Sequence, residues 1–151
     1  MPKPVIDPAA ARVGTSYPPP HHEPCAGRKS WPLTNQLGLS QFGVNRVELA
    51  PGSWSTQRHW HKASDELVVV ISGEVVVVSD DGEEVVKAGE CFGFTAGVPN
   101  AHHIQNRSNQ PAVFFDIGGR DLWDVSTFPD IGIEAKPFVE IRFRPIKNKT
   151  K

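Results

Sequence analysis

Apolar and polar residues alternate over short stretches along most of the chain after residue 42, in the pattern of β-strands. Residues 42–49 (FGVNRVEL) alternate with a period of two, as expected for a half-buried strand. The β-branched runs 67–71 (LVVVI) and 75–78 (VVVV) flank Ser72-Gly73, a break that is typical of a tight hairpin. A second turn is predicted at residues 80–82 (DDG).

The rest of the chain continues this pattern and shows little sign of helix. Further strands are predicted at residues 83–87, 101–106, 113–117 and 138–143. No window of about a dozen residues has a helical apolar period, and the only helical piece expected is a short one at residues 122–125. Many short strands without interleaved helices predict an all-β fold, a sandwich or a barrel, formed by one domain.

Prolines cluster at the start of the chain, where eight of the 14 lie within the first 32 residues. Because proline fixes φ and lacks a backbone donor, this stretch is not expected to form a helix or a central strand. We predict an extended N-terminal arm over residues 1–34, a single barrel domain over residues 35–146 and a frayed tail over residues 147–151. The arm is expected to lie on a surface or to reach a partner subunit, with a flexible tail as the alternative.

Composition and charge exclude several classes of protein. The 151 residues carry 16 Lys and Arg against 17 Asp and Glu, so the net charge of -1 provides no basic field for nucleic acid or anionic membranes. The longest apolar run, residues 67–71, is too short to span a bilayer. Two cysteines cannot form a disulfide framework, and the N-terminus lacks the apolar segment of a secretory signal. We therefore expect a cytoplasmic protein without nucleic-acid or membrane partners.

Candidate chemistry begins with two histidines, His59 and His61, in a segment (residues 55–62) predicted to be a strand. Alternate residues of a strand face the same side, so both imidazoles point one way. Glu66 opens the next strand, and an antiparallel partner strand would bring His102 beside them. Burying these groups without a cation would cost several kcal/mol or more. Imidazole and carboxylate together suit one divalent transition metal, which could be Fe, Mn, Zn, Ni or Cu.

The spacing of these residues resembles the two consensus motifs of the cupin superfamily. The first motif, G-x5-H-x-H-x3,4-E-x6-G, corresponds to residues 52–73 with one extra residue before the first histidine. The second, G-x5-P-x-G-x2-H-x3-N, corresponds to residues 89–106, although Thr95 replaces the proline and two extra residues precede the histidine. The resemblance covers roughly residues 40–118. It implies a small jelly-roll barrel whose metal ligands are His59, His61, Glu66 and His102.

The two-residue insertion, Asn100-Ala101, leaves the path of the loop before the last histidine open. His103 is an alternative ligand, but His102 keeps the three-residue spacing to Asn106. By strand parity His103 is expected to point outward, at the surface or at an interface.

Two neighbours are candidates for a substrate pocket. Gln57 shares its parity with the histidines and is expected to face the cavity, where it could contact substrate or a metal ligand; a polar residue at the barrel rim is an equal alternative. Phe94 is expected to belong to the core and to help form an apolar wall of the pocket.

The resemblance implies a metal-dependent enzyme that acts on a small oxygenated organic molecule, as a dioxygenase or as an isomerase or lyase. Glu66 is the candidate catalytic residue, as a ligand that also moves a proton. The alternative is a non-catalytic, metal-bearing module that binds or senses a small ligand. The open strand edges of a small jelly roll and the proline-rich arm predict a homodimer, and exchange of the arms between subunits remains open.

Overall fold

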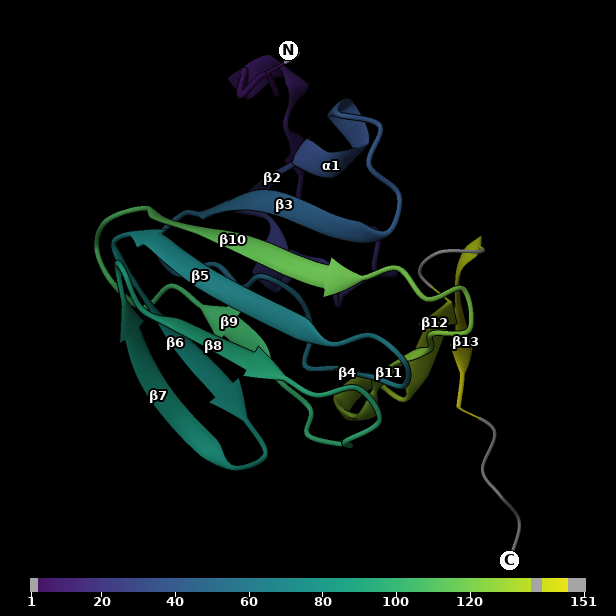
Figure 1. Ribbon diagram of the computed structural model, residues 1–151. Helices are drawn as coiled ribbons and strands as arrows, with labels where there is room; N and C mark the ends of the chain where they lie inside the picture. The colour runs from purple at the N-terminus through teal and green to yellow at the C-terminus, as the bar shows by residue number, and fades with distance from the viewer. Residues whose placement is uncertain (1–2, 137–139, 147–151) are drawn as a thin grey trace, which may run out of the picture.

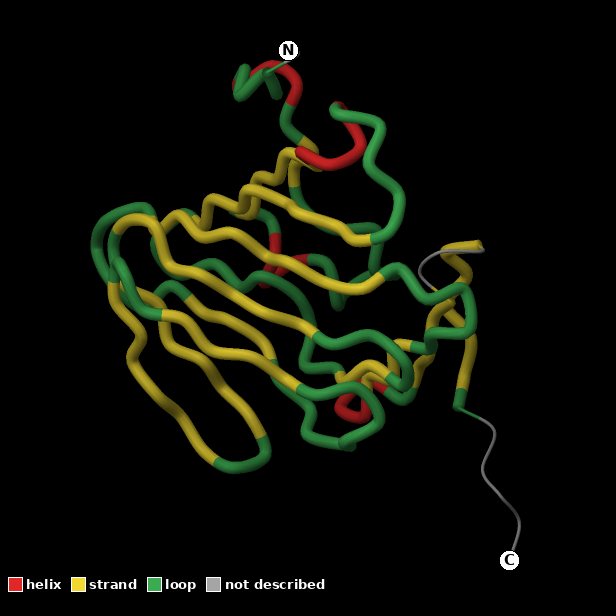
Figure 2. Tube along the Cα trace, viewed as in Figure 1, coloured by secondary structure: helices red, strands yellow, loops and turns green. Residues whose placement is uncertain are grey.

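The structure, a computed structural model, describes residues 3–136 and 140–146 and consists of short antiparallel strands with very little helix (Figures 1 and 2). The largest sheet has six strands in the order β1 (Arg12–Val13), β2 (Arg28–Pro32), β3 (Phe42–Leu49), β10 (Ala112–Gly119), β5 (Glu66–Ser72) and β8 (Cys91–Phe94). The predicted all-β fold is confirmed. The predicted frayed tail, residues 147–151, lies outside the described residues.

Two smaller sheets complete the fold. The three-stranded sheet has the order β7 (Gly82–Lys87), β6 (Glu74–Ser79) and β9 (His103–Gln105). The four-stranded sheet has the order β13 (Glu140–Pro145), β12 (Ile133–Lys136), β11 (Ser126–Phe128) and β4 (Trp60–His61). The remaining elements are single turns: η1 (Pro8–Ala10), η2 (Glu23–Cys25), α1 (Leu33–Gln36) and η3 (Pro129–Ile131). Among the residues that the structure describes, no helix has the length and apolar character needed to cross a membrane.

The core lies between the six-stranded and the three-stranded sheets. Alternate residues of β3, β5 and β10 are buried on one face of the large sheet, which explains the period of two in the sequence. They pack against the valines of β6 and their neighbours in β7 and β9. The main members of this cluster are Val47, Leu49, Val68, Val70, Phe114, Val75, Val77, Val86 and Ile104. This packing makes the fold a jelly-roll sandwich with the inner faces of its sheets apolar.

The hairpin expected at Ser72-Gly73 is wrong. β5 pairs with β10 and β8, whereas β6 pairs with β7 and β9, so the chain changes sheets at this point. Gly73 has φ 75°, a conformation that a glycine adopts without steric cost, and it lets the chain turn sharply between the layers. The second expected turn is confirmed, because β6 and β7 form a hairpin in which Ser79 lies opposite Gly82.

The N-terminal segment is more regular than its prolines suggested. Residues 28–32 form β2, which pairs with β3 inside the large sheet, so the expectation of an arm without a sheet strand is wrong there. Pro32 stands at the end of that strand, where its missing N–H interrupts little of the ladder. The helix α1 follows directly and lies against β3, where Thr34 accepts the backbone N–H of Val44 at 3.1 Å. Residues 122–125, expected to be helical, form no helix.

Candidate metal centre

Main-chain pairing brings the first and last of the predicted ligands together. His59 and His102 form an isolated antiparallel bridge, with N–H to carbonyl distances of 3.0 and 2.9 Å in the two directions. The predicted strand over residues 55–62 shortens to β4, whose last residue is His61. Glu66 is the first residue of β5. These four residues, here called the His–Glu cluster, therefore come from three chain segments: residues 59–61, the start of β5, and residue 102.

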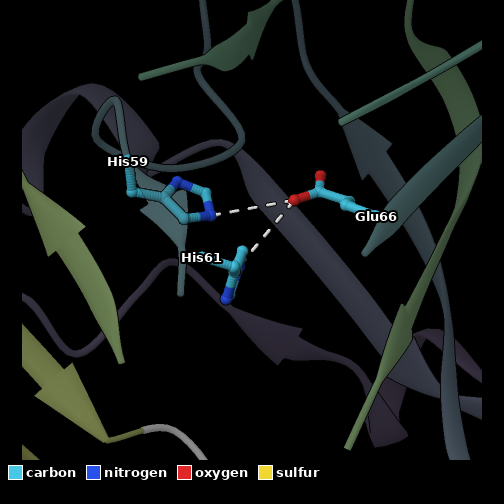
Figure 3. Close-up of side chains that lie close together, drawn as sticks. All are labelled: His59, His61 and Glu66. Carbon is cyan, nitrogen blue, oxygen red and sulfur yellow. Dashed lines mark ion pairs between the residues drawn. The ribbon is translucent and has the colours of Figure 1, made fainter. Parts of the chain in front are cut away.

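The side chains of the cluster converge on the Glu66 carboxylate. The Oε2 atom of Glu66 lies 3.2 Å from Nε2 of His102, 3.8 Å from Nε2 of His61 and 3.9 Å from Nε2 of His59. Figure 3 shows the imidazoles of His59 and His61 approaching the Glu66 carboxylate from the same side. The ligand atoms of His59, His61 and Glu66 all lie within 4.8 Å of one another.

Each imidazole of the cluster is held in the same tautomer. Nδ1 of His59 lies 3.0 Å from the carbonyl of Gln57, and Nδ1 of His102 lies 2.8 Å from the carbonyl of Asn100. Nδ1 of His61 lies 2.6 Å from a carboxylate oxygen of Asp124. These oxygens can only accept hydrogen bonds, so each Nδ1 carries a proton, and Nε2 is the ring nitrogen that each imidazole turns toward Glu66.

A single metal ion suits this set of donors. Three imidazole lone pairs facing a carboxylate repel one another unless a cation or added protons lie between them. Atoms bound to one ion at about 2.1 Å lie about 3.0 Å apart at right angles and about 4.2 Å apart across the ion. The Nε2 to Oε2 distances of 3.2 to 3.9 Å fall inside that range. The chemistry of the donors and their distances from Glu66 therefore fit a divalent transition metal. The mutual spacing of the ligand atoms supports His59, His61 and Glu66, and His102 adjoins this group through Glu66.

Burial and mutual charge set the protonation states of the cluster. Burial, which disfavours the imidazolium form, lowers the pKa of His59 to about 3. Burial also opposes ionisation of Glu66, but the hydrogen bond with His102 and the neighbouring imidazoles outweigh it and lower its pKa to about 2. A neutral imidazole and an ionised carboxylate are the forms that bind a metal.

Asp124 is a partner of the cluster that the sequence did not reveal. Its carboxylate is fully buried and accepts the Ala63 backbone N–H at 2.8 Å on one oxygen and His61 on the other. Burial disfavours the imidazolium form of His61, but the bond to Asp124 and the negative charges of Asp124, Glu66 and Asp116 together outweigh burial and raise the pKa of His61. Such a carboxylate fixes the ring orientation and increases the basicity of Nε2.

The His–Glu cluster lies in the wall of a cavity of about 530 Å³. The cavity wall also includes Asp116 of β10, whose carboxylate accepts a hydrogen bond from the Asn45 side chain at 3.3 Å. Burial and the charge of Glu66 raise the pKa of Asp116 to about 6. Asp116 is therefore a carboxyl group of the cavity, apart from the predicted ligands, whose pKa is raised toward neutral pH.

The two predicted substrate-pocket residues lie in different places. Phe94 stacks on the imidazole of His102, with ring centroids 3.4 Å apart, and so adjoins the cluster. Gln57 is buried, and its side-chain amide donates to the His21 carbonyl at 2.7 Å, away from the residues that line the cavity. The expectation that it faces the cavity relied on strand parity, and residue 57 is not in a strand.

His103 is buried, so its expected exposure is wrong. It is 3% exposed, its Nδ1 donates to the Thr56 carbonyl at 3.0 Å, and its ring packs edge-on against Trp54. The segment before β4 bends over this histidine and covers it. His102, and not His103, is the histidine beside Glu66, which resolves the path of the loop at Asn100-Ala101.

The central part of the chain matches a known family. Residues 45–118 match the cupin domain. The tetracenomycin polyketide synthase protein TcmJ of Streptomyces glaucescens is 34% identical over 111 residues, which cover 72% of each chain. The chain is a member of the cupin family. The resemblance drawn from the two histidine motifs is thereby confirmed.

Solved cupin structures extend the similarity beyond the central domain. A cupin from Silicibacter pomeroyi, described as a sugar phosphate isomerase, is 36% identical with a TM-score of 0.89, over 97% of this cupin and 94% of that chain. A structure from Acidithiobacillus ferrooxidans, provisionally assigned as a sugar phosphate isomerase, is 25% identical with a TM-score of 0.74, over 82% and 80% of the two chains. The N-terminal strands and the C-terminal sheet are thus part of a shared architecture.

Proposed function

We propose that this cupin is a metal-dependent isomerase that acts on a small phosphorylated sugar, with one divalent transition metal held by His59, His61, Glu66 and His102. The observation that carries the proposal is the cavity, which places the His–Glu cluster and a separate carboxyl group, Asp116, in one wall. The similarity over nearly the whole chain to a cupin described as a sugar phosphate isomerase supports the choice of substrate.

Different residues of the cavity would have different roles in such a reaction. When bound, the metal would act as a Lewis acid toward the carbonyl and hydroxyl oxygens of the substrate. Asp116 accepts a proton from the carbon next to the carbonyl and returns it to the former carbonyl carbon, while the hydroxyl proton moves from one of the two substrate oxygens to the other. Asn45 holds the Asp116 carboxylate in place by its hydrogen bond. Glu66, ionised and surrounded by three imidazoles, serves as ligand, and this role leaves proton transfer to Asp116.

The environment of Asp116 suits proton transfer. A group with a pKa close to the working pH can both accept and return a proton, and the pKa of Asp116 is raised to about 6 by burial and by the charge of Glu66. Deleting such a group typically lowers the rate by about 100-fold to 10,000-fold.

Proton exchange with solvent tests the proposal even while the product is unidentified. Metal-loaded protein is incubated in D2O with aldose and ketose phosphates, and deuterium incorporation next to the carbonyl is followed by NMR. Asp116→Asn is expected to slow exchange at least about 100-fold while retaining the metal. Asp81→Asn, in the exposed β6–β7 turn, is the matched control and should exchange at the wild-type rate. Metal-loaded protein that binds these sugars but neither exchanges nor converts them would instead identify a binding module.

A further inference from the structure

Three arginines line the cavity, and two of them lie on strands distant from the His–Glu cluster. The third, Arg120, donates to the Leu39 carbonyl and to the side chains of Thr34 and Asn35. Arg12 lies in β1 and Arg28 in β2, and both line the cavity. β2 is separated from β5, which carries Glu66, by β3 and β10. With neighbouring strands about 4.8 Å apart, the strands of Arg28 and Glu66 are about 14 Å apart. The two side chains therefore enter the cavity from well-separated parts of the same sheet.

The guanidinium of Arg28 is only partly satisfied by the protein. Its Nη1 donates to the Ser30 hydroxyl at 2.9 Å and, more weakly, to the Gly14 carbonyl at 3.5 Å. Its Nε is buried and has no hydrogen-bond partner. A buried polar group without a partner costs about 1 to 3 kcal/mol, and more when the group is charged. Arg28 thus has an N–H group at Nε that is free to donate a hydrogen bond to a molecule in the cavity.

The contrast with the surface arginines is clear. Arg58 lies 2.7 Å from Asp130 and 2.8 Å from Asp80, and Arg107 lies 2.6 Å from Glu83. Within residues 3–136 and 140–146, no ion pair joins Arg28 to a carboxylate. The carboxylate whose charge acts most strongly on Arg28 is Asp116, which does not form an ion pair with it. Burying an unpaired cation is costly, so an anion entering the cavity would be stabilised there.

We propose that Arg28, with Arg12 at the exposed rim, binds the phosphate group of the substrate. The planar fork of a guanidinium matches two oxygens of a phosphate. A phosphorylated sugar bound in this way extends from the arginines past Asp116 to the His–Glu cluster, which places its carbonyl end near the metal ligands. The identity of the sugar rests on the proposed function, but the anion site depends only on the cavity and its arginines.

The test measures binding of inorganic phosphate to the metal-loaded protein by calorimetry at low ionic strength. Arg28→Gln is expected to weaken phosphate binding at least tenfold, and Arg12→Gln by a smaller factor, with metal content unchanged. Arg28→Lys, which keeps the charge but loses the fork, is expected to be intermediate. Arg107→Gln, the same change at an exposed position outside the cavity, should bind phosphate like the wild type. Circular dichroism establishes that each variant is folded, and Arg12→Gln provides a second measurement if Arg28→Gln does not fold.

Two results would overturn the phosphate site. Phosphate affinity that is equal in the wild type, Arg28→Gln and Arg12→Gln would show that another group, such as the metal, holds the anion. Acetate binding more tightly than phosphate would show that the site prefers a carboxylate. The two proposals fail separately. Binding that depends on Arg28 without sugar isomerisation contradicts only the proposed function, whereas isomerisation with an unchanged KM in Arg28→Gln contradicts only the phosphate site.

Discussion

Replacing Asp124 by asparagine should weaken metal binding through its effect on His61. The carboxylate accepts two hydrogen bonds, from the His61 imidazole at 2.6 Å and from the Ala63 backbone at 2.8 Å. An asparagine side chain has one carbonyl oxygen and can accept only one of them in this geometry. If this oxygen accepts the Ala63 backbone N–H, the side-chain NH2 group of the asparagine faces Nδ1 of His61. That arrangement favours the tautomer with the proton on Nε2, the atom that would bind the metal.

The size of the effect follows from the burial of Asp124. The residue is only 1% exposed, so water has little access to replace the lost acceptor. Removing an outer partner of a metal-binding histidine typically lowers metal affinity by about 10-fold to 100-fold. This corresponds to about 1.4 to 2.7 kcal/mol. We expect Asp124→Asn to fall within this range, because the carboxylate loses both its charge and one of its two bonds.

Competition with a chromogenic chelator measures the affinity of each variant for zinc. Asp121→Asn is the matched control, because Asp121 lies in the same loop but is exposed, and its carboxylate accepts the backbone N–H of Trp123 and does not contact His61. The hydrogen bond from Asp124 to residue 121 involves the backbone carbonyl, which the substitution keeps. It should bind zinc as tightly as the wild type. A folded Asp124→Asn variant whose zinc affinity stays within twofold of the wild type would refute the assigned role of Asp124.

Two further predictions concern stability and are tested by chemical denaturation. Gly73→Ala should lower the unfolding free energy by about 1 to 3 kcal/mol, because the glycine has φ 75° and an added Cβ would lie 3.0 Å from the Pro111 carbonyl. Gly52→Ala, with φ 78° but open space around it, should cost less, and an equal cost would contradict the argument from close packing. Asp116→Asn should alter the pH dependence of stability. Because folding raises the pKa of Asp116 to about 6, the folded state holds the proton more tightly than the unfolded state. The wild type should therefore lose stability relative to the variant as the pH rises from about 4 to about 6. A difference that is constant over this range would exclude a raised pKa.

The strands and the ligand pattern could be predicted because both depend on local order in the sequence. Residues 42–49 alternate along one strand, and the structure has that strand with the same bounds. The spacing of His59, His61, Glu66 and His102, taken together, carried enough information to indicate a metal site. The break at Ser72-Gly73 was misleading, because a hairpin and a crossover between sheets both need a turn of this kind. Which of the two forms depends on pairing with β10, about 40 residues away.

The rest of the cavity could not be predicted from local pattern. No spacing pattern in the sequence marks Asp116, Arg28 or Asp124. Only the folded chain shows that Asp116 and Arg28 line one cavity and that Asp124 bonds to the predicted metal ligand His61. Gln57 shows the limit of strand parity, since the rule fails where the backbone leaves the strand. The number of prolines in the first 32 residues led to the wrong prediction that this segment has no strand inside a sheet. Residues 28–31 contain no proline, so their backbone can pair with β3.

Metal content tests the central claim most directly. Elemental analysis of the untagged protein should find about one equivalent of a transition metal, and the double variant His59→Ala/His61→Ala should contain none, because it lacks two of the donors that face Glu66. Reconstitution with Fe, Mn, Zn, Ni and Cu, followed by removal of free ion, extends the same comparison to protein purified without metal. A folded wild-type protein that retains no metal after reconstitution, or a double variant that retains as much as the wild type, would contradict a metal site at the His–Glu cluster.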